Sequence, residues 1–303
     1  MSEIHEKRQI INAQIVNGFV SGQGGGNPAG VVLNADELGE AEMLKIAGKI
    51  GLSETAFVSR SKTEGFKLDF FTPNRRIAHC GHATIATFSY LAEMGMVTDG
   101  LTSKETVDGP RKIVIKEGAA YMEQLAPRYR PSPDWKDDGV TLDDVLESLN
   151  LLLKDLDQRI DPVLVNTGNS FIVIAVKDRQ VLKNIQPNFD AISKISDRLD
   201  LIGYYVFTTD VGSHEIDATT RMFAPRYAIE EESATGMAAG PLACVLFDYL
   251  GLEKEKIVIG QGCFMEPPSP SLITVELMLD NGKITGLMAG GYGKMMKKME
   301  IDI

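Results

Sequence analysis

The sequence contains little of what stabilises a small secreted protein or anchors a protein in a membrane. It has three cysteines in 303 residues, and Cys80, Cys244 and Cys263 are widely spaced. An odd, dispersed set of this kind forms neither a disulfide framework nor a zinc ribbon. Apolar runs such as residues 171–176 are short, whereas a membrane-spanning helix needs about 20 apolar residues. The sequence therefore predicts no transmembrane helix.

Positive charge is also in short supply. The chain has 31 Lys and Arg against 42 Asp and Glu, which gives a formal net charge of −11. Such a surface repels phosphate backbones and anionic lipids, so neither nucleic acid nor a membrane is an expected partner. The charged residues 1–10 are not followed by the apolar stretch of about 7–15 residues that a secretory signal needs. We expect a cytoplasmic protein.

What is present is an ordinary globular composition. Hydrophobic residues make up 44% and charged residues 24% of the chain, which suffices for a substantial core. The length is compatible with one large domain or with two domains of about 150 residues each.

Local patterns predict a mixture of helices and strands. The strand expected at 52–59 places Glu54 on its more apolar face, because side chains alternate between the two faces of a strand. Helix caps, hydrophobic periodicity and turn residues predict the other elements. They are helices from a capping box at 34–37 to Gly51, at 79–94, 141–156 and 236–250, strands at 67–72, 162–176 and 204–209, and a hairpin at Asn281-Gly282.

Three short motifs occur twice in the same order, about 140 to 155 residues apart. This repeat predicts two similar halves, each a strand-rich layer around one central helix. The paired motifs are Gly26-Asn27-Pro28 with Gly168-Asn169-Ser170, Phe71-Thr72-Pro73 with Phe223-Ala224-Pro225, and Cys80-Gly81-His82-Ala83 with Thr235-Gly236-Met237-Ala238.

The third pair of motifs opens the two apolar helices. A helix N-terminus presents unpaired N–H groups and the positive end of the helix dipole, so two of them at a shared cleft would suit a small carboxylate. Gly81 and Gly236 would let the backbone approach that ligand closely. The alternative is that both glycines only allow tight turns into packed helices.

These motifs together resemble the phenazine biosynthesis PhzF-like family over almost the whole chain. The resemblance implies an α+β, diaminopimelate epimerase-like fold of two pseudo-symmetric halves, residues 1–126 completed by a strand at 291–303, and residues 127–290. It also implies a cofactor-independent isomerase, often a homodimer, acting on a small carboxylate in the cleft between the halves. The matching segments are Gly26-Asn-Pro-Ala-Gly-Val-Val-Leu33, Leu52-Ser-Glu-Thr-Ala-Phe-Val58, Phe71-Thr-Pro73, Cys80-Gly-His-Ala-Thr84, Phe223-Ala-Pro-Arg226 and Ala234-Thr-Gly236.

The resemblance assigns roles to individual residues. The family's general acid/base glutamate falls on Glu54 and its accessory histidine on His82. Glu232 stands where the family commonly has a catalytic aspartate, with Ser233 in place of a proline and Met237 in place of a serine. The substrate-binding positions are Asn27, Gly81, Thr235, Gly236 and Met237. The altered segment 232–237 leaves the substrate open.

Glu54 also makes chemical sense as the acid/base group. Desolvation on an apolar face disfavours the charged form of a carboxyl group, and a carboxyl that both takes and returns a proton near neutral pH can shift a proton between carbons. The structural alternative is a strand glutamate that reaches solvent.

Three other readings of the sequence remain. A family member with the altered 232–237 segment could bind a small molecule or a protein without catalysis. An epimerase or racemase could use Cys80, although Ser233 stands where the wider fold's second thiol would be. His79, Cys80 and His82 resemble metal ligands, but no further His or Cys cluster completes a four-ligand site, so no metal is expected.

Overall fold

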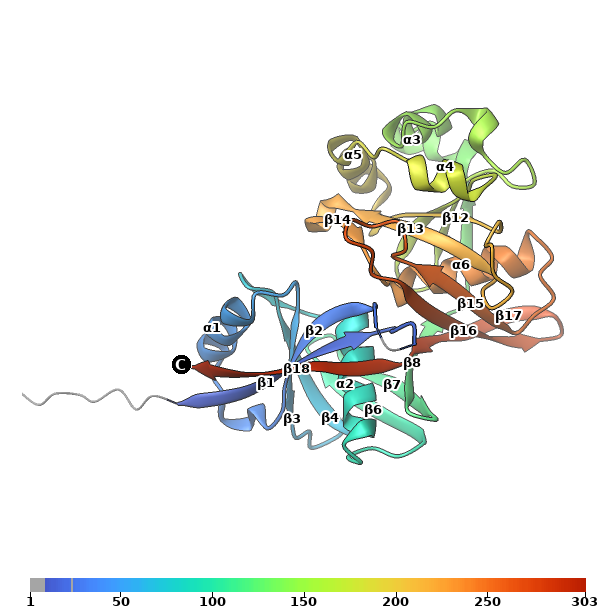
Figure 1. Cartoon of the computed structure of the whole chain (residues 1–303). Coiled ribbons are helices and arrows are strands. Elements are labelled where there is room, and N and C mark those ends of the chain that lie inside the picture. Colours follow the sequence, from blue (N-terminus) through green and yellow to red (C-terminus); the bar gives the residue numbers. More distant parts are fainter. Residues whose placement is uncertain (1–8, 23) are drawn as a thin grey trace, which may run out of the picture. The chain divides into compact units, whose positions relative to one another are not determined.

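The computed structural model describes residues 9–22 and 24–303, which divide into two compact units (Figure 1). Unit 1 contains the described residues up to Gly18, then Pro28–Met122 and Tyr292–Ile303, and unit 2 contains Phe19–Asn27 and Glu123–Gly291. The short segment 19–27 joins unit 2 through backbone hydrogen bonds. Leu272 N donates to Phe19 O at 3.0 Å, and Gly26 N donates to Pro270 O at 2.9 Å.

Unit 1 is a layer of strands around one central helix. Its first strand, β1 (Ile10–Gly18), pairs antiparallel with the last strand of the chain, β18 (Gly293–Asp302). β2 (Asn27–Val32) runs parallel to β3 (Thr55–Ser59), which pairs antiparallel with β4 (Phe66–Phe71). β4 continues the layer to β5 (Arg76–Ile77) and β6 (Gly100–Thr106), and β6, β7 (Gly109–Lys116) and β8 (Ala119–Leu125) form a meander.

The central helix of unit 1 is α2 (Gly81–Glu93), and it is buried along its whole length from Gly81 to Leu91. It contacts β1, β3, β7 and β18, which surround it in Figure 1. Two glycines let strands approach closely, because a Cβ on Gly18 would lie 2.8 Å from His82 O and one on Gly293 2.8 Å from Ser89 Cβ. The helix that carries His82 is thereby held rigidly, while α1 (Glu40–Ile50) packs outside the layer against β3, β4 and β18.

Unit 2 repeats the theme with a longer sheet. Neighbouring strands in it run β9 (Arg128–Pro131), β10 (Val163–Asn166), β11 (Ser170–Ala175), β12 (Gly203–Thr208), β13 (Ala218–Ala224), β15 (Lys256–Gln261), β16 (Ser271–Asp280) and β17 (Lys283–Gly291). β14 (Ile229–Glu232) pairs with the end of β13. The almost fully buried α6 (Gly236–Asp248) contacts β11, β16 and β17.

A second set of helices in unit 2 makes a separate hydrophobic core. Alternate residues of β11 and β12, among them Ile172 and Tyr204, point to this core, as strand geometry requires. The helices are α3 (Leu142–Ser148), α4 (Arg179–Asn184) and α5 (Phe189–Leu199), and shorter 3₁₀ turns lie at Ala35–Glu37, Ser132–Asp138, Leu153–Asp155 and Pro225–Tyr227.

Several predicted elements are confirmed, and others are wrong in detail. The Asn281-Gly282 hairpin joins β16 to β17, with φ of 50° and 76°, as a type I′ turn requires. The helix after Asn34 begins only at Glu40, because Asn34 is left-handed and makes no side-chain cap, whereas Gly39 N bonds to Glu42. The strand expected at 162–176 is a hairpin that turns at Gly168, where φ is 117°.

The helix predicted over 141–156 is the largest error. Thr141 caps it as a helix start, but α3 ends at Ser148. Asn150 takes a left-handed conformation with φ of 56°, and Leu151 N bonds back to Leu146 O, which is a common way to end a helix. The helical pattern of apolar residues thus continues in the sequence beyond Asn150, although the turn there ends the helical hydrogen bonds of α3.

In the part of the chain that the structure describes, no helix combines the length and apolar character needed to cross a bilayer.

Candidate functional site

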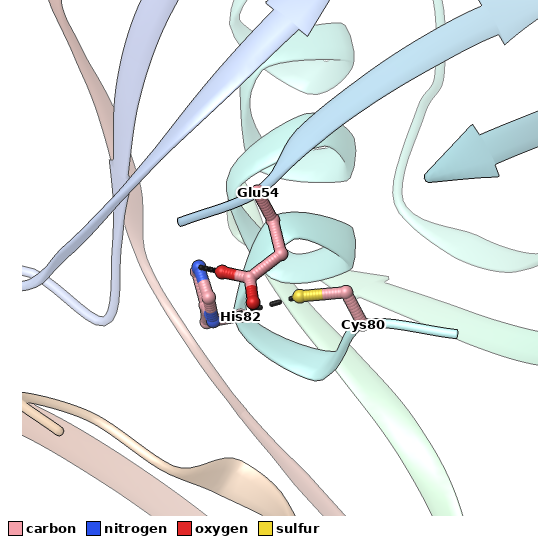
Figure 2. Close-up of side chains that lie close together, drawn as sticks. All are labelled: Glu54, Cys80 and His82. Carbon is pink, nitrogen blue, oxygen red and sulfur yellow. Dashed lines mark hydrogen bonds and ion pairs between the residues drawn. The ribbon is translucent and has the colours of Figure 1, made fainter. Parts of the chain in front are cut away.

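Glu54, Cys80 and His82 come together in unit 1, and their side chains point toward one another (Figure 2). Cys80 is the extended N-cap residue of α2, and His82 lies in the first turn of that helix. Glu54 lies immediately before β3 rather than inside a longer strand, and its carbonyl accepts a hydrogen bond from Gly30 N at 3.0 Å. β3 packs against α2, and the glutamate just before β3 lies beside the start of that helix.

The imidazole of His82 lies between two partners of different chemistry. Its Nε2 is 3.3 Å from Glu54 Oε2, and its Nδ1 is 3.6 Å from Cys80 Sγ. The side chains of His82 and Glu54 are only 4% and 12% exposed. Glu54 Oε2 is within ion-pair range of the ring, but within the described residues it makes no aligned hydrogen bond. A buried carboxylate oxygen of Glu54 therefore lies near the histidine ring without an aligned hydrogen bond to it.

A buried lysine lies near this group, and no sequence pattern predicted it. Lys104, on β6, is fully buried and donates to His79 Nδ1 at 3.1 Å and to Thr84 Oγ1, with its Nζ 4.9 Å from the centre of the Phe70 ring. Burial lowers the pKa of Lys104 to about 7, although the nearby Cys80 opposes the shift. Burial, with the charge of Lys104, also holds the pKa of His79 well below its usual 6.5.

Thr84 connects the buried lysine to the helix start. Its hydroxyl accepts from Lys104 and donates to Cys80 O at 2.6 Å. Nothing in the local sequence signals this arrangement, because a lysine in an alternating strand ordinarily points to solvent. It depends on β6 lying beside β4, so that Lys104 reaches Phe70.

In unit 2 the structure brings together three other predicted site residues. Asn27 Nδ2 donates to Glu232 Oε1 at 3.0 Å and to Ala234 O at 3.1 Å, and Thr235 Oγ1 donates to Glu232 Oε2. Both carboxylate oxygens of Glu232 therefore accept hydrogen bonds. The segment around residues 232–235 is thus tied to residue 27, more than 200 positions away in the chain.

Gln261 extends the hydrogen-bond network of Glu232. It is a second buried residue for which the sequence predicted no role. Its Nε2 donates to Glu232 O at 2.7 Å, and its Oε1 accepts from Thr235 N at 3.1 Å and from Tyr205 OH at 2.8 Å. The side chain is almost completely buried. No predicted role fell on this glutamine, which the pairing of β13 with β14 and β15 brings beside the Glu232 segment.

The remaining predicted positions have simpler surroundings. Gly81 is the buried first residue of α2. A Cβ on Gly236 would lie 2.8 Å from Phe19 Cζ, which favours the packing explanation for this glycine. Met237 Sδ accepts from Asn169 Nδ2 at 3.4 Å. Ser233 Oγ donates to Gly26 O at 3.0 Å.

Comparison with known proteins shows the family to which the chain belongs. The sequence model of the family described as "Phenazine biosynthesis-like protein" (PhzC-PhzF) matches residues 16–295. The chain belongs to this family. It is 36% identical to an uncharacterized isomerase of Clostridium acetobutylicum over 78% of each chain, and 31% identical to the uncharacterized isomerase YfhB of Bacillus subtilis over 90% of this chain and 92% of that one.

Solved structures show the same fold. The crystal structure of a PhzF-family phenazine biosynthesis protein from Bacillus anthracis is 25% identical, covers 97% of this chain and 100% of its own, and has a TM-score of 0.86. A hydroxyproline epimerase from Agrobacterium vitis has a TM-score of 0.55 at 12% identity, over 97% of this chain and 93% of its own. The PhzF-family protein therefore has the α+β, diaminopimelate epimerase-like fold that the resemblance implied.

Proposed function

We propose that this PhzF-family protein is a cofactor-independent isomerase that moves a proton between two carbons of a small carboxylate metabolite. Family membership and the isomerase names of its relatives support the reaction class. The single observation that carries the mechanism is the Glu54 carboxylate, whose buried Oε2 lies 3.3 Å from His82 Nε2 and is not hydrogen bonded within the described residues.

In this proposal Glu54 is the general acid/base. Its carboxylate takes a proton from one substrate carbon, and the electron pair of the broken C–H bond moves into the adjoining conjugated system. The resulting carboxylic acid returns the proton to a second carbon, so that charge and atoms balance without another reactant. One carboxyl group suits both steps, because it accepts the proton as a carboxylate and returns it as a carboxylic acid.

His82 positions the base. Its ring is fixed on the first turn of a helix that is buried on all sides, and Nε2 faces the carboxylate. The first N–H groups of the same helix have no acceptor within the helix, and together with the helix dipole they favour a negative charge nearby. We assign the substrate carboxylate to such backbone groups, including Gly81, and a neutral hydrogen-bonding role to the imidazole.

The unit 2 group serves binding rather than proton transfer in this proposal. Glu232 was expected to be catalytic, but both of its oxygens accept hydrogen bonds, from Asn27 and Thr235. We therefore assign Glu232 the task of holding these two polar residues and the start of α6 in place. Thr235, Gly236 and Met237 follow it directly and supply the backbone of that helix start.

Deuterium exchange tests the proposal. The protein is incubated in deuterated water with pooled small carboxylates, and NMR follows deuterium incorporation into carbon positions. The wild type should catalyse incorporation into one or more compounds, and Glu54→Gln should abolish it while ligand binding and folding persist. Wild-type protein that incorporates no deuterium but binds a carboxylate would support the binding-only alternative, and an active Glu54→Gln variant would refute the assigned base.

One observation favours a second reaction, racemisation or epimerisation that uses Cys80. The thiol lies in the same cluster as Glu54, with Sγ 3.6 Å from His82 Nδ1. In such a reaction the Cys80 thiol would be one of the two acid/base groups that act on opposite faces of one carbon. Loss of exchange at a single stereocentre after thiol alkylation or in Cys80→Ser would support this reaction, and full activity of Cys80→Ser would exclude it.

The proposal also includes a cytoplasmic location, a biosynthetic pathway and a homodimer. The dimer follows from the resemblance alone and is tested by light scattering on the purified protein. A mass near 33.1 kDa would show a monomer instead.

A further inference from the structure

Donor atoms of three different chemical types converge at the start of α2. Glu54, Cys80 and His82 each offer one ligand atom, a carboxylate oxygen, a sulfur and a ring nitrogen, and these lie within 4.8 Å of one another. The sequence grouped His79 with Cys80 and His82, but His79 Nδ1 bonds to Lys104. Glu54, from a distant part of the chain, takes the third place instead (Figure 2).

We propose that this cluster is a Zn²⁺ site, formed by Cys80 Sγ, one ring nitrogen of His82 and the Glu54 carboxylate. Tetrahedral zinc with bonds of about 2.0–2.3 Å places neighbouring ligand atoms about 3.4–3.6 Å apart. The contacts of 3.3 Å and 3.6 Å lie close to this spacing. Glu54 faces His82 Nε2, whereas Cys80 faces His82 Nδ1. One of these two side chains must therefore move before both can bind a cation held by a single ring nitrogen.

Glu54 is the partner that can move. Cys80 and His82 belong to the rigid start of the buried helix α2, whereas the Glu54 carboxylate ends a side chain with three rotatable bonds. Its Oε2 is not held by a hydrogen bond within the described residues. Closing the longest separation, at most 4.8 Å, to a ligand spacing requires a shift of about 1 Å, which a side-chain rotation supplies.

The donor set determines which cation binds. Thiolate and imidazole favour zinc over magnesium and calcium, which take six or more oxygen ligands. On binding, the Cys80 thiol releases its proton to solvent, a sulfur–zinc bond forms, and all but one of the waters of the hydrated cation leave. Three protein ligands keep a fourth position open for water or another small ligand.

Zinc binding would occupy the carboxylate to which we assign proton transfer, so zinc should act as a reversible inhibitor. The inhibition rests on the proposed function, whereas the binding rests only on the geometry of the three side chains. The two ideas can therefore fail separately.

Metal titration of the full-length protein tests the binding. Protein stripped of metal is titrated with Zn²⁺ in competition with a chromophoric chelator, and with Co²⁺ while the near-ultraviolet thiolate-to-cobalt absorption is recorded. We expect one ion per chain and a cobalt–thiolate band. Cys80→Ser and Glu54→Gln should weaken Zn²⁺ binding by at least about 10- to 100-fold, since loss of even an outer partner of a ligand has this effect.

Matched controls identify the site. Cys263→Ser removes a half-buried thiol and His214→Gln an exposed histidine, both outside the cluster, and both should bind zinc like the wild type. Serine is a favoured N-cap residue, so Cys80→Ser should retain α2, and circular dichroism verifies this.

The outcomes separate the two proposals. No cobalt–thiolate band at saturating Co²⁺, or zinc binding unchanged in Cys80→Ser, would overturn the zinc site even if the protein catalyses exchange. If zinc binds as expected but the protein catalyses no exchange, the zinc site is supported and the proposed isomerase activity is refuted. Zinc bound at the cluster with exchange unaffected would overturn the inhibition.

Discussion

Lys104 Nζ lies 3.1 Å from His79 Nδ1 in the interior of unit 1, and the lysine is fully buried. No carboxylate pairs with the lysine in the contacts of the described residues, which are His79, Thr84 and the ring of Phe70. An ammonium group needs three acceptors, and here two hydrogen-bond acceptors and an aromatic face provide them. Burial of a cation without an anionic partner makes stability depend on pH.

Lys104→Met should flatten the dependence of stability on pH above neutrality. The pKa of Lys104 is about 7 when folded against 10.5 as the ordinary value, so between these values the unfolded chain binds more protons. The free energy of unfolding should therefore rise with pH in this window, by about 2 kcal/mol from pH 7 to 9. Urea denaturation at both values measures it. Equal slopes for the wild type and Lys104→Met would contradict the prediction.

His82→Gln should slow exchange more than it weakens binding. Glutamine keeps a polar group near Glu54 but cannot reproduce both ring contacts, to Oε2 and to Cys80 Sγ. A displaced base costs up to about 100-fold in rate, and this loss should appear in kcat, with KM nearly unchanged. Steady-state exchange rates measure it once a substrate is known. An effect confined to KM would assign His82 to binding instead.

Asn27→Ala should destabilise the protein by about 1–3 kcal/mol. The side chain is buried and donates to Glu232 Oε1 and to Ala234 O, and a buried acceptor left without its donor costs about this much. Denaturation by urea gives the change. Asn169→Ala, at the matching position of the second repeat motif, removes only a weak bond to Met237 sulfur and should cost less. Equal losses would show that the Glu232 network adds nothing.

Gly236→Ala should be destabilising because of Phe19. A Cβ at residue 236 would lie 2.8 Å from Phe19 Cζ, and overpacking of a buried site costs about 1–3 kcal/mol. Leucine at position 19 lacks the atom that makes this contact. Gly236→Ala should therefore lower the free energy of unfolding less in a Phe19→Leu background. A double-mutant cycle of unfolding free energies measures this coupling. Additive effects would refute the steric explanation. They would favour the alternative that Gly236 lets the backbone approach a ligand.

Some of the candidate site was predictable because its residues are close in sequence. Cys80, Gly81 and His82 occupy the first turn of a helix whose apolar pattern is clear. Glu232 and Thr235 are likewise within reach of each other across one turn, and they do bond. The resemblance then supplied Glu54 and Asn27, which no local spacing connects to these helices.

The secondary-structure errors have a common cause. Hydrophobic periodicity reports which side chains are buried, but a turn depends on the backbone conformation of one or two residues. Asn150 and Gly168, with φ of 56° and 117°, interrupt segments whose apolar pattern continues beyond them. The capping signal at Asn34 was also ambiguous, since Gly39 with Glu42 provides the cap that is used.

The sequence by itself determined the family and, through that resemblance, the α+β fold, and it located the residues at the two helix starts, because motifs and helix-start signals are local in the chain. Only the tertiary structure decided that Lys104 is buried, that Gln261 joins the Glu232 network, and that Glu54 rather than His79 stands beside Cys80 and His82. Each of these depends on which strands lie side by side. Strand pairing joins residues far apart in the chain, and the chemistry of a side chain changes with the partners and the burial that this pairing gives it.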